Sequence, residues 1–169
     1  MEVYEAIRTI LAVRQYQDTP IPDDAVHRIV EAGRLTASAS NKQPWHFIVV
    51  RERETLRRLG ESARSGAYTA QAPLAIVVAV EQTPFAVSDG SLAIHAMMLT
   101  AWAEGIGSNW VGFAGRLEET KALLGIPDDL DVLAILPFGY PATEVGRGKK
   151  NRKSLAEVAS SERFGQPFA

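Results

Sequence analysis

The heptapeptide Leu74-Ala75-Ile76-Val77-Val78-Ala79-Val80 is apolar at every position. A strand with one exposed face alternates apolar and polar residues, so an entirely apolar strand is typical of a sheet covered on both faces. Three further short β-rich runs follow the same logic, at 46–50, 109–113 and 132–136. The sequence therefore predicts a sheet of about four strands, with the heptapeptide at its centre and helices on both sides.

The segments between these strands have the apolar spacing of helices. The clearest is 88–104, which is apolar nearly all round and stops at Gly105, so we expect it in the core or in a subunit interface. Residues 66–71 are predicted to form a flexible loop. A further helix is predicted to begin at Pro22 and to end between residues 33 and 35. The other predicted helices are 2–12, 54–63, 117–124 and 155–159. These elements predict an α+β fold and one domain over residues 1–169.

The composition is that of an ordinary globular protein, with 46% hydrophobic and 22% charged residues among 169. The sequence has no cysteine, which excludes a disulfide scaffold, a thiol nucleophile and an iron–sulfur cluster and fits a reducing cytoplasm. The longest uncharged apolar stretch, 90–103, has 14 residues, against the ~20 that span a bilayer. We therefore expect a cytoplasmic protein without a membrane partner.

Several common catalytic motifs are absent from the sequence. His27, His46 and His95 lack metal-ligand spacing, and there is no HExxH, so we expect no metal site. The sequence also contains no G-x-S-x-G and no G-x-x-x-x-G-K-[ST]. Gly105-Ile106-Gly107 follows a predicted helix rather than a strand, which argues against a Rossmann dinucleotide site.

Positive charge is concentrated in one stretch, 147–153, which holds five basic residues and no acidic one. The whole chain has 18 basic and 20 acidic residues, so the rest carries 13 against 20, a net charge of −7. This pattern favours a local anion site over a nucleic-acid surface, because nucleic-acid binders are more often basic overall. A solvated charged loop before the last helix accounts for the stretch equally well.

A second polar stretch, Ser38-Ala39-Ser40-Asn41-Lys42-Gln43-Pro44-Trp45, lies between a predicted helix and a predicted strand. Its hydroxyls, amides and backbone N–H groups are the donors and acceptors that suit a flat heteroaromatic ring. A plain surface loop, with Trp45 in the core, is the alternative interpretation.

Five segments, in order along almost the whole chain, resemble motifs of the FMN-dependent nitroreductase family in its short form. The family motifs are R-S-V-R-x-F, P-S-x-x-N-x-Q-P-W, G-L-G-S-x-W, L-P-x-G-Y-P and K-x-R-K. Their counterparts here are Val13-Arg14-Gln15-Tyr16, 38–45, Gly105-Ile106-Gly107-Ser108-Asn109-Trp110, Leu136-Pro137-Phe138-Gly139-Tyr140-Pro141 and Lys150-Asn151-Arg152-Lys153. The resemblance implies a three-layer α/β/α sandwich with a mainly antiparallel sheet of four to five strands. It also implies a homodimer with two FMN sites at the interface, each lined by both chains, and helix 88–104 in that interface.

The resemblance further implies roles for individual residues. Arg14 reaches the pyrimidine edge or the ribityl chain of the flavin, and as the catalytic candidate it is the cation that stabilises the reduced ring. Lys150 and Arg152 bind the phosphate through charge-assisted hydrogen bonds. Pro137, Phe138 and Gly139 lie along the isoalloxazine, with the Gly139 N–H near N5. The remaining contacts come from the 38–43 stretch. Ser38, Ala39 and Ser40 line the site and are expected from the second copy. Asn41 and Gln43 hold or support the ring edge and the loop.

The chain departs from the family pattern before Arg14, where Ile10 or Leu11 and Ala12 replace an Arg and a Ser, and at Ala37, which replaces a Pro. We therefore expect one phosphate or ribityl contact to come from elsewhere, with Arg8 as the candidate.

The implied activity is NAD(P)H-driven, ping-pong reduction of small electron acceptors such as nitroaromatics or quinones, with the chemistry supplied by FMN. Three alternatives stay open. One is another flavin reaction on the same fold, such as dehalogenation or dehydrogenation. Another is a non-catalytic, FMN-binding or purely structural dimer. The third is a nucleic-acid binder using 147–153, which lacks aromatic interleaving and overall positive charge.

Overall fold

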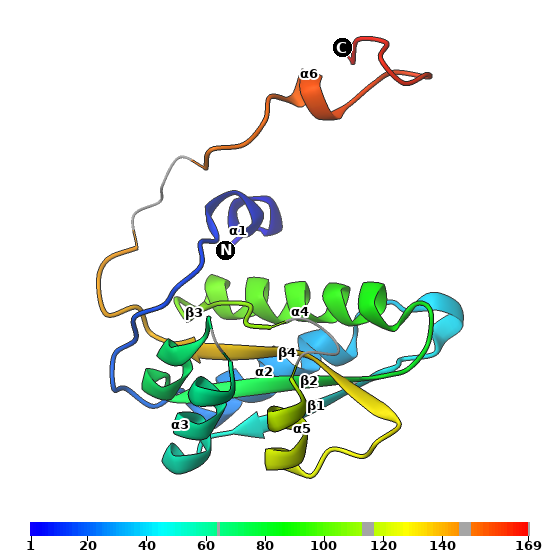
Figure 1. The fold of residues 1–169 in the computed structure, drawn as a ribbon. Helices are drawn as coiled ribbons and strands as arrows, with labels where there is room; N and C mark the ends of the chain where they lie inside the picture. Colours follow the sequence, from blue (N-terminus) through cyan, green and yellow to red (C-terminus); the bar gives the residue numbers. More distant parts are fainter. Residues whose placement is uncertain (64, 113–116, 146–149, 169) are drawn as a thin grey trace.

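The central sheet has four strands in the order β1-β2-β4-β3, and every neighbouring pair is antiparallel (Figure 1). The computed structural model describes residues 1–63, 65–112, 117–145 and 150–168. Residue 113 of the predicted strand 109–113 and residues 147–149 of the basic stretch lie outside them. The strands are β1 (Trp45–Val50), β2 (Leu74–Glu81), β3 (Gly107–Ser108) and β4 (Leu130–Gly139). The predicted central heptapeptide is therefore an inner strand of the sheet.

Alternate side chains of β2 enter two separate cores, one on each face of the sheet. Leu74, Ile76, Val78 and Val80 pack in the core shared with α2 (Asp23–Arg34) and α4 (Ala86–Ala103). Ala75, Val77 and Ala79 pack in the other core, beside α3 (Arg53–Ser62) and α5 (Glu118–Leu124). All seven side chains are buried. The structure thus confirms the predicted α/β/α layering and explains why residues 74–80 of β2 include no polar position.

The last strand is longer than predicted and the third is shorter, and Pro137 accounts for part of the difference. β4 continues through Pro137 to Gly139, whereas β3 ends at Ser108 and only an isolated bridge joins Val111 to Ile135. The Asn109 N–H donates to the Pro137 carbonyl at 3.4 Å. The N–H and C=O of one strand residue face the same neighbouring strand, so the N–H that Pro137 lacks would have faced the β3 side of β4. A proline is tolerated where a neighbouring ladder is already interrupted.

The first helix, α1 (Val3–Thr9), is shorter than the predicted 2–12, because Ile10 leaves the helical conformation with ψ of 130°. Its apolar side chains are largely exposed: Val3 is 71%, Tyr4 76% and Ile7 45% exposed. Figure 1 shows α1 beyond α4, on the side away from the sheet. The apolar spacing therefore predicts the helix correctly, but this chain alone does not bury it.

The segment expected to be a flexible loop is a packed 3-10 helix, η2 (Ala67–Gln71). It lies against α3, and an added Cβ at Gly60 would come within 3.0 Å of the Ala67 carbonyl oxygen and the Ala70 nitrogen. Thr69 is fully buried. The other helices begin and end within two residues of the predicted bounds, including α6 (Leu155–Val158). No helix formed by the described residues is long and apolar enough to cross a membrane.

Candidate functional site

The structure places the predicted site residues in three regions: the 38–43 loop and residues 137–139 lie at opposite ends of the sheet, and Lys150 lies against α1. Trp45, which directly follows the 38–43 loop, is paired with Val80 at one end of β2. Phe138 is paired with Leu74 at the other end. Six residue steps along a strand span about 20 Å. Within one chain, the 38–43 loop and residues 137–139 therefore cannot contact the same part of one ligand.

Arg14 lies at the end of the sheet where β4 finishes. Its segment is held by main-chain hydrogen bonds on both sides: the Val13 N–H donates to the Ser108 carbonyl at 3.0 Å, and the Gln17 N–H donates to the Tyr140 carbonyl at 2.8 Å. Val13 is buried, whereas Arg14 is exposed. The Arg14 side chain has no hydrogen bond or ion pair to a described residue. The paired segment thus holds a cation that has no partner among the described residues at the end of the sheet where β4 finishes.

Tyr16 fixes this segment from inside. Its hydroxyl donates to the Val13 carbonyl at 2.6 Å and lies 3.4 Å from the Pro137 carbonyl. Burial, and to a lesser extent the nearby Tyr68, raises the pKa of Tyr16, while the Arg14 charge lowers it. The net shift is upward, so the phenol stays protonated and keeps donating.

Gly139 is required by this packing. An added Cβ would lie 2.8 Å from both Tyr16 Cδ1 and Pro73 Cδ, distances that real Cβ contacts essentially never show. We expect Gly139→Ala to displace the tyrosine and lower the free energy of unfolding by about 1–3 kcal/mol, the usual effect of overpacking. Urea unfolding of the two proteins measures the change. An unchanged unfolding midpoint would show that Tyr16 does not constrain this position.

Residues 137–139 present main chain rather than side chains to any ligand. All three are buried, and the Phe138 ring belongs to the core that β2 shares with α2 and α4. Their predicted contact with a ring therefore depends on backbone atoms, as the predicted role of the Gly139 N–H already requires.

The 38–43 loop, with the 3-10 turn η1 (Ala39–Asn41), has an unusual backbone. Ser40, Asn41 and Gln43 have φ of 51°, 55° and 51°, a region that non-glycine residues rarely occupy. The loop is stabilised by the Gln43 N–H, which donates to Ser38 Oγ at 2.9 Å, and by the Ala39 N–H, which donates to the buried Asp89 on α4 at 3.1 Å. Such strained backbone clusters at functional sites. The loop therefore supports a binding role more than a plain connection.

Lys150 and Arg152 lie near each other, and Lys150 contacts α1. Lys150 Nζ donates to the Ile7 carbonyl at 2.6 Å, one of the carbonyls left without a partner in the last turn of α1. Partial burial, followed by the Arg152 charge, lowers the pKa of Lys150. Arg8, the expected substitute contact, instead forms a bidentate ion pair with Glu5 at 2.9 Å. In the described chain, Lys150 and Arg152 are thus near each other, and Lys150 contacts α1.

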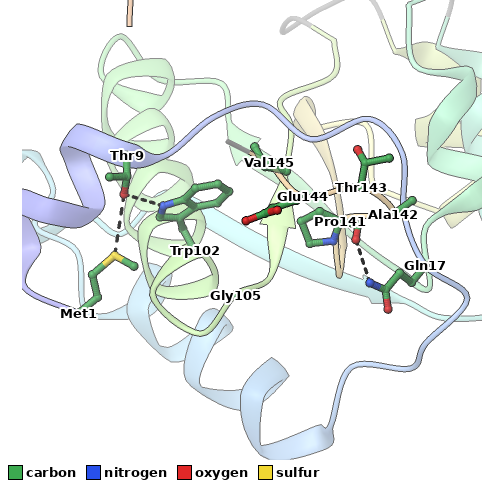
Figure 2. Close-up of a pocket in the computed structure, with 10 residues that line it drawn as sticks. All are labelled: Met1, Thr9, Gln17, Trp102, Gly105, Pro141, Ala142, Thr143, Glu144 and Val145. Carbon is green, nitrogen blue, oxygen red and sulfur yellow. Dashed lines mark hydrogen bonds between the residues drawn. The ribbon is translucent and has the colours of Figure 1, made fainter. Parts of the chain in front are cut away.

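A pocket of about 390 Å³ lies beside the Arg14 end of the sheet, within the usual size range of ligand sites. Figure 2 shows it between the end of α1, the end of α4 and residues 141–145. Trp102 Nε1 donates to Thr9 Oγ1 at 2.9 Å and closes one side. None of the described residues that line the pocket is a predicted cofactor ligand. The pocket therefore adjoins the predicted site without being part of it.

Two polar residues that sequence reasoning missed belong to the Arg14 group. The buried Asn109 donates from its side-chain amide to the hydroxyl oxygen of Tyr68, which is partly buried. Asn109 lies within the G-S-N-W segment, which is the one signal that could have indicated it. Tyr68 is in η2 and carries no motif. Among the described residues, no group of three His, Asp or Glu could hold a metal ion.

Comparisons with known proteins identify one family. A family model described as the nitroreductase family matches residues 8–86 and 67–140. Two archaeal relatives carry the provisional name NADH dehydrogenase/NAD(P)H nitroreductase. The protein from Archaeoglobus fulgidus is 40% identical over 152 residues, covering 85% of this chain and 87% of the relative. The protein from Methanothermobacter thermautotrophicus is 38% identical over 154 residues, covering 86% and 81%.

A solved structure shows the same fold. It is an FMN-dependent nitroreductase from Clostridium difficile R20291, with a TM-score of 0.86 and 23% sequence identity. The match covers 95% of this chain and 99% of that one.

Proposed function

The chain belongs to the nitroreductase family, and on this premise we propose that it is an FMN-dependent oxidoreductase that uses NAD(P)H to reduce small electron acceptors. The observation that carries the proposal is Arg14, an exposed cation without a partner among the described residues, on a segment that is hydrogen-bonded to the main chain of Ser108 and Tyr140 at the end of β4. The names of the similar proteins, which mention NAD(P)H and FMN, support it.

The donors available in the described chain fit FMN. A flavin ring has several acceptors along its edge, which polar loop residues, main-chain N–H groups and Arg14 can satisfy. Its phosphate needs cations, and Lys150 and Arg152 are adjacent to each other. When bound, FMN would supply the redox chemistry, exchanging a hydride from reduced nicotinamide for two electrons, with protons from solvent, to an acceptor such as a nitroaromatic or quinone that binds in the nicotinamide's place.

We also propose that the enzyme is a homodimer with a site at each end of the interface. The 38–43 loop and residues 137–139 lie at opposite ends of the sheet, so a two-fold axis can bring the loop of one copy to the strand end of the other. Exposed apolar side chains on and beside α4, such as Phe85, Val87 and Leu92, give such a contact an apolar surface to bury. The symmetry would then complete two equivalent sites.

Arg14 has an electrostatic task in this scheme. Reduction places negative charge on the N1–C2=O edge of the flavin, and a fixed guanidinium there stabilises that charge. We expect Arg14→Ala to weaken FMN binding about 10- to 100-fold, because hydrogen bonds to charged groups contribute about 1.5–3 kcal/mol. Quenching of flavin fluorescence on titration into apoprotein measures it. Arg58→Ala, which removes an exposed cation on α3, is the matched control. An unchanged affinity and reduction rate would remove Arg14 from the site.

The activity itself is tested by the absorption spectrum of the purified protein. We expect a yellow protein whose flavin band bleaches with NADH or NADPH and recovers when a nitroaromatic or quinone is added. A band that stays unbleached would indicate a non-catalytic flavin carrier. Bleaching without recovery by these acceptors, followed by recovery with a halogenated aromatic, would favour the dehalogenation alternative.

A further inference from the structure

We propose that Tyr68 is a second hydrogen-bond donor to the electron-rich edge of the flavin, next to Arg14, and that Asn109 is the positioning residue that orients it. This inference rests on the proposed function. It concerns Tyr68, which lies in no family motif, and Asn109, which occupies the variable position of G-L-G-S-x-W; η2 and the segment after β3 bring them together.

The hydrogen bond between the two side chains leaves one proton without a partner. The Asn109 amide donates to the Tyr68 oxygen, so that oxygen serves as the acceptor and its own O–H must point elsewhere. No described residue accepts this proton. Because Tyr68 is only partly buried, its proton is open to solvent or to a bound ligand. A hydroxyl held in this way is suited to a ligand that presents an acceptor.

Asn109 is itself fixed. Its side chain is buried, and its main-chain N–H donates to the Pro137 carbonyl at 3.4 Å. The amide that orients the phenol is therefore tied to the strand end expected along the ring. This contact gives Tyr68 a defined position relative to residues 137–139.

The neighbouring groups show which donors remain free. Tyr16 has already donated its proton to the Val13 carbonyl, at 2.6 Å. Both Tyr68 and Arg14 lie near enough to Tyr16 to influence its pKa, in opposite directions. Two donors without a partner among the described residues, the Arg14 guanidinium and the Tyr68 hydroxyl, thus both lie near Tyr16, which packs against Gly139 at the end of β4.

A donor at this edge distinguishes the two oxidation states. Hydrogen bonds to a charged acceptor are stronger than those to a neutral one, so a phenol bonds more strongly to the ring once reduction has placed negative charge there. Tyr68 is therefore expected to raise the affinity for reduced FMN more than the affinity for oxidised FMN. A side chain that only fills space would change both affinities equally.

The test compares Tyr68→Phe with the wild type in two measurements, the dissociation constant of oxidised FMN and the two-electron midpoint potential. We expect the variant to lose about tenfold more affinity for reduced than for oxidised FMN, which lowers the midpoint potential by about 30 mV. Tyr4→Phe, which removes the hydroxyl of an exposed tyrosine on α1, is the control and should change neither value.

Asn109→Leu tests the orientation with an uncharged side chain of nearly the same size. Leucine cannot donate to the Tyr68 oxygen, so the phenol loses the contact that orients it, and no charge is added beside the ring. We expect this variant to lower the midpoint potential in the same direction as Tyr68→Phe, with the urea unfolding midpoint showing that it is folded. It also decides the matter if Tyr68→Phe proves unstable.

Two results would overturn the inference: a midpoint potential that neither variant changes, or an equal loss of affinity for both oxidation states. Wild-type protein that takes up no FMN would instead overturn the proposed function, so the two failures are distinguishable.

Discussion

The Lys150→Ala, Arg152→Ala double variant is expected to purify without colour. The FMN phosphate carries a charge between about −1.5 and −2 at neutral pH and has three acceptor oxygens. Each charge-assisted hydrogen bond contributes about 1.5–3 kcal/mol. Two of them contribute about 3–6 kcal/mol, so the dissociation constant should rise by a factor on the order of 10² to 10⁴. The measurements are the flavin-to-protein absorbance ratio after purification and fluorescence titration with added FMN.

The control for this variant removes equal charge elsewhere. Arg58 and Arg163 are exposed and lie outside the predicted site, so Arg58→Ala, Arg163→Ala should stay yellow. Because Lys150 also donates to the Ile7 carbonyl, Lys150→Met shows how far this helix contact alone affects binding. A double variant that purifies with a full complement of FMN would remove the phosphate site from 150–153.

Phe138→Ala is expected to cause the largest loss of stability. The ring is completely buried in the core that β2 shares with α2 and α4. Truncating a buried phenylalanine typically costs about 3–5 kcal/mol. Since domains have only about 5–15 kcal/mol in total, the variant should be largely unfolded at temperatures that the wild type withstands. Urea unfolding followed by circular dichroism measures the difference.

The same chain provides a matched control. Phe164 is fully exposed near the C-terminal end, so Phe164→Ala should leave the unfolding midpoint of the monomer unchanged. Phe138→Leu, which keeps an apolar side chain, should retain FMN affinity, because residues 137–139 are expected to contact the ring through main-chain atoms. A strong loss of affinity in a folded Phe138→Leu variant would show that the aromatic ring itself contributes to binding.

The secondary structure could be predicted wherever the pattern is local. The apolar run 74–80 indicates an inner strand, because a strand without a polar face must be covered on both sides. The helices α2 and α3 follow from their apolar spacing. The extent of β3 could not be predicted in the same way, because the Asn109 N–H meets a proline carbonyl on β4 and the ladder is interrupted there.

The candidate site was predicted only in part. Motifs indicated Arg14, the 38–43 loop, Pro137–Gly139, Lys150 and Arg152, and we propose Tyr68 and Asn109 in addition, because the structure pairs their side chains. The assignment of these residues to FMN stays a prediction.

The amino-acid sequence by itself determined the inner strand, most of the helices and the family, because apolar periodicity and motif spacing depend on residues near one another in the chain. Only the tertiary structure decided which distant residues meet. The register of β2 places the 38–43 loop and residues 137–139 at opposite ends of the sheet, and packing leaves the apolar face of α1 exposed. Both outcomes depend on contacts between segments far apart in sequence, which no local pattern encodes.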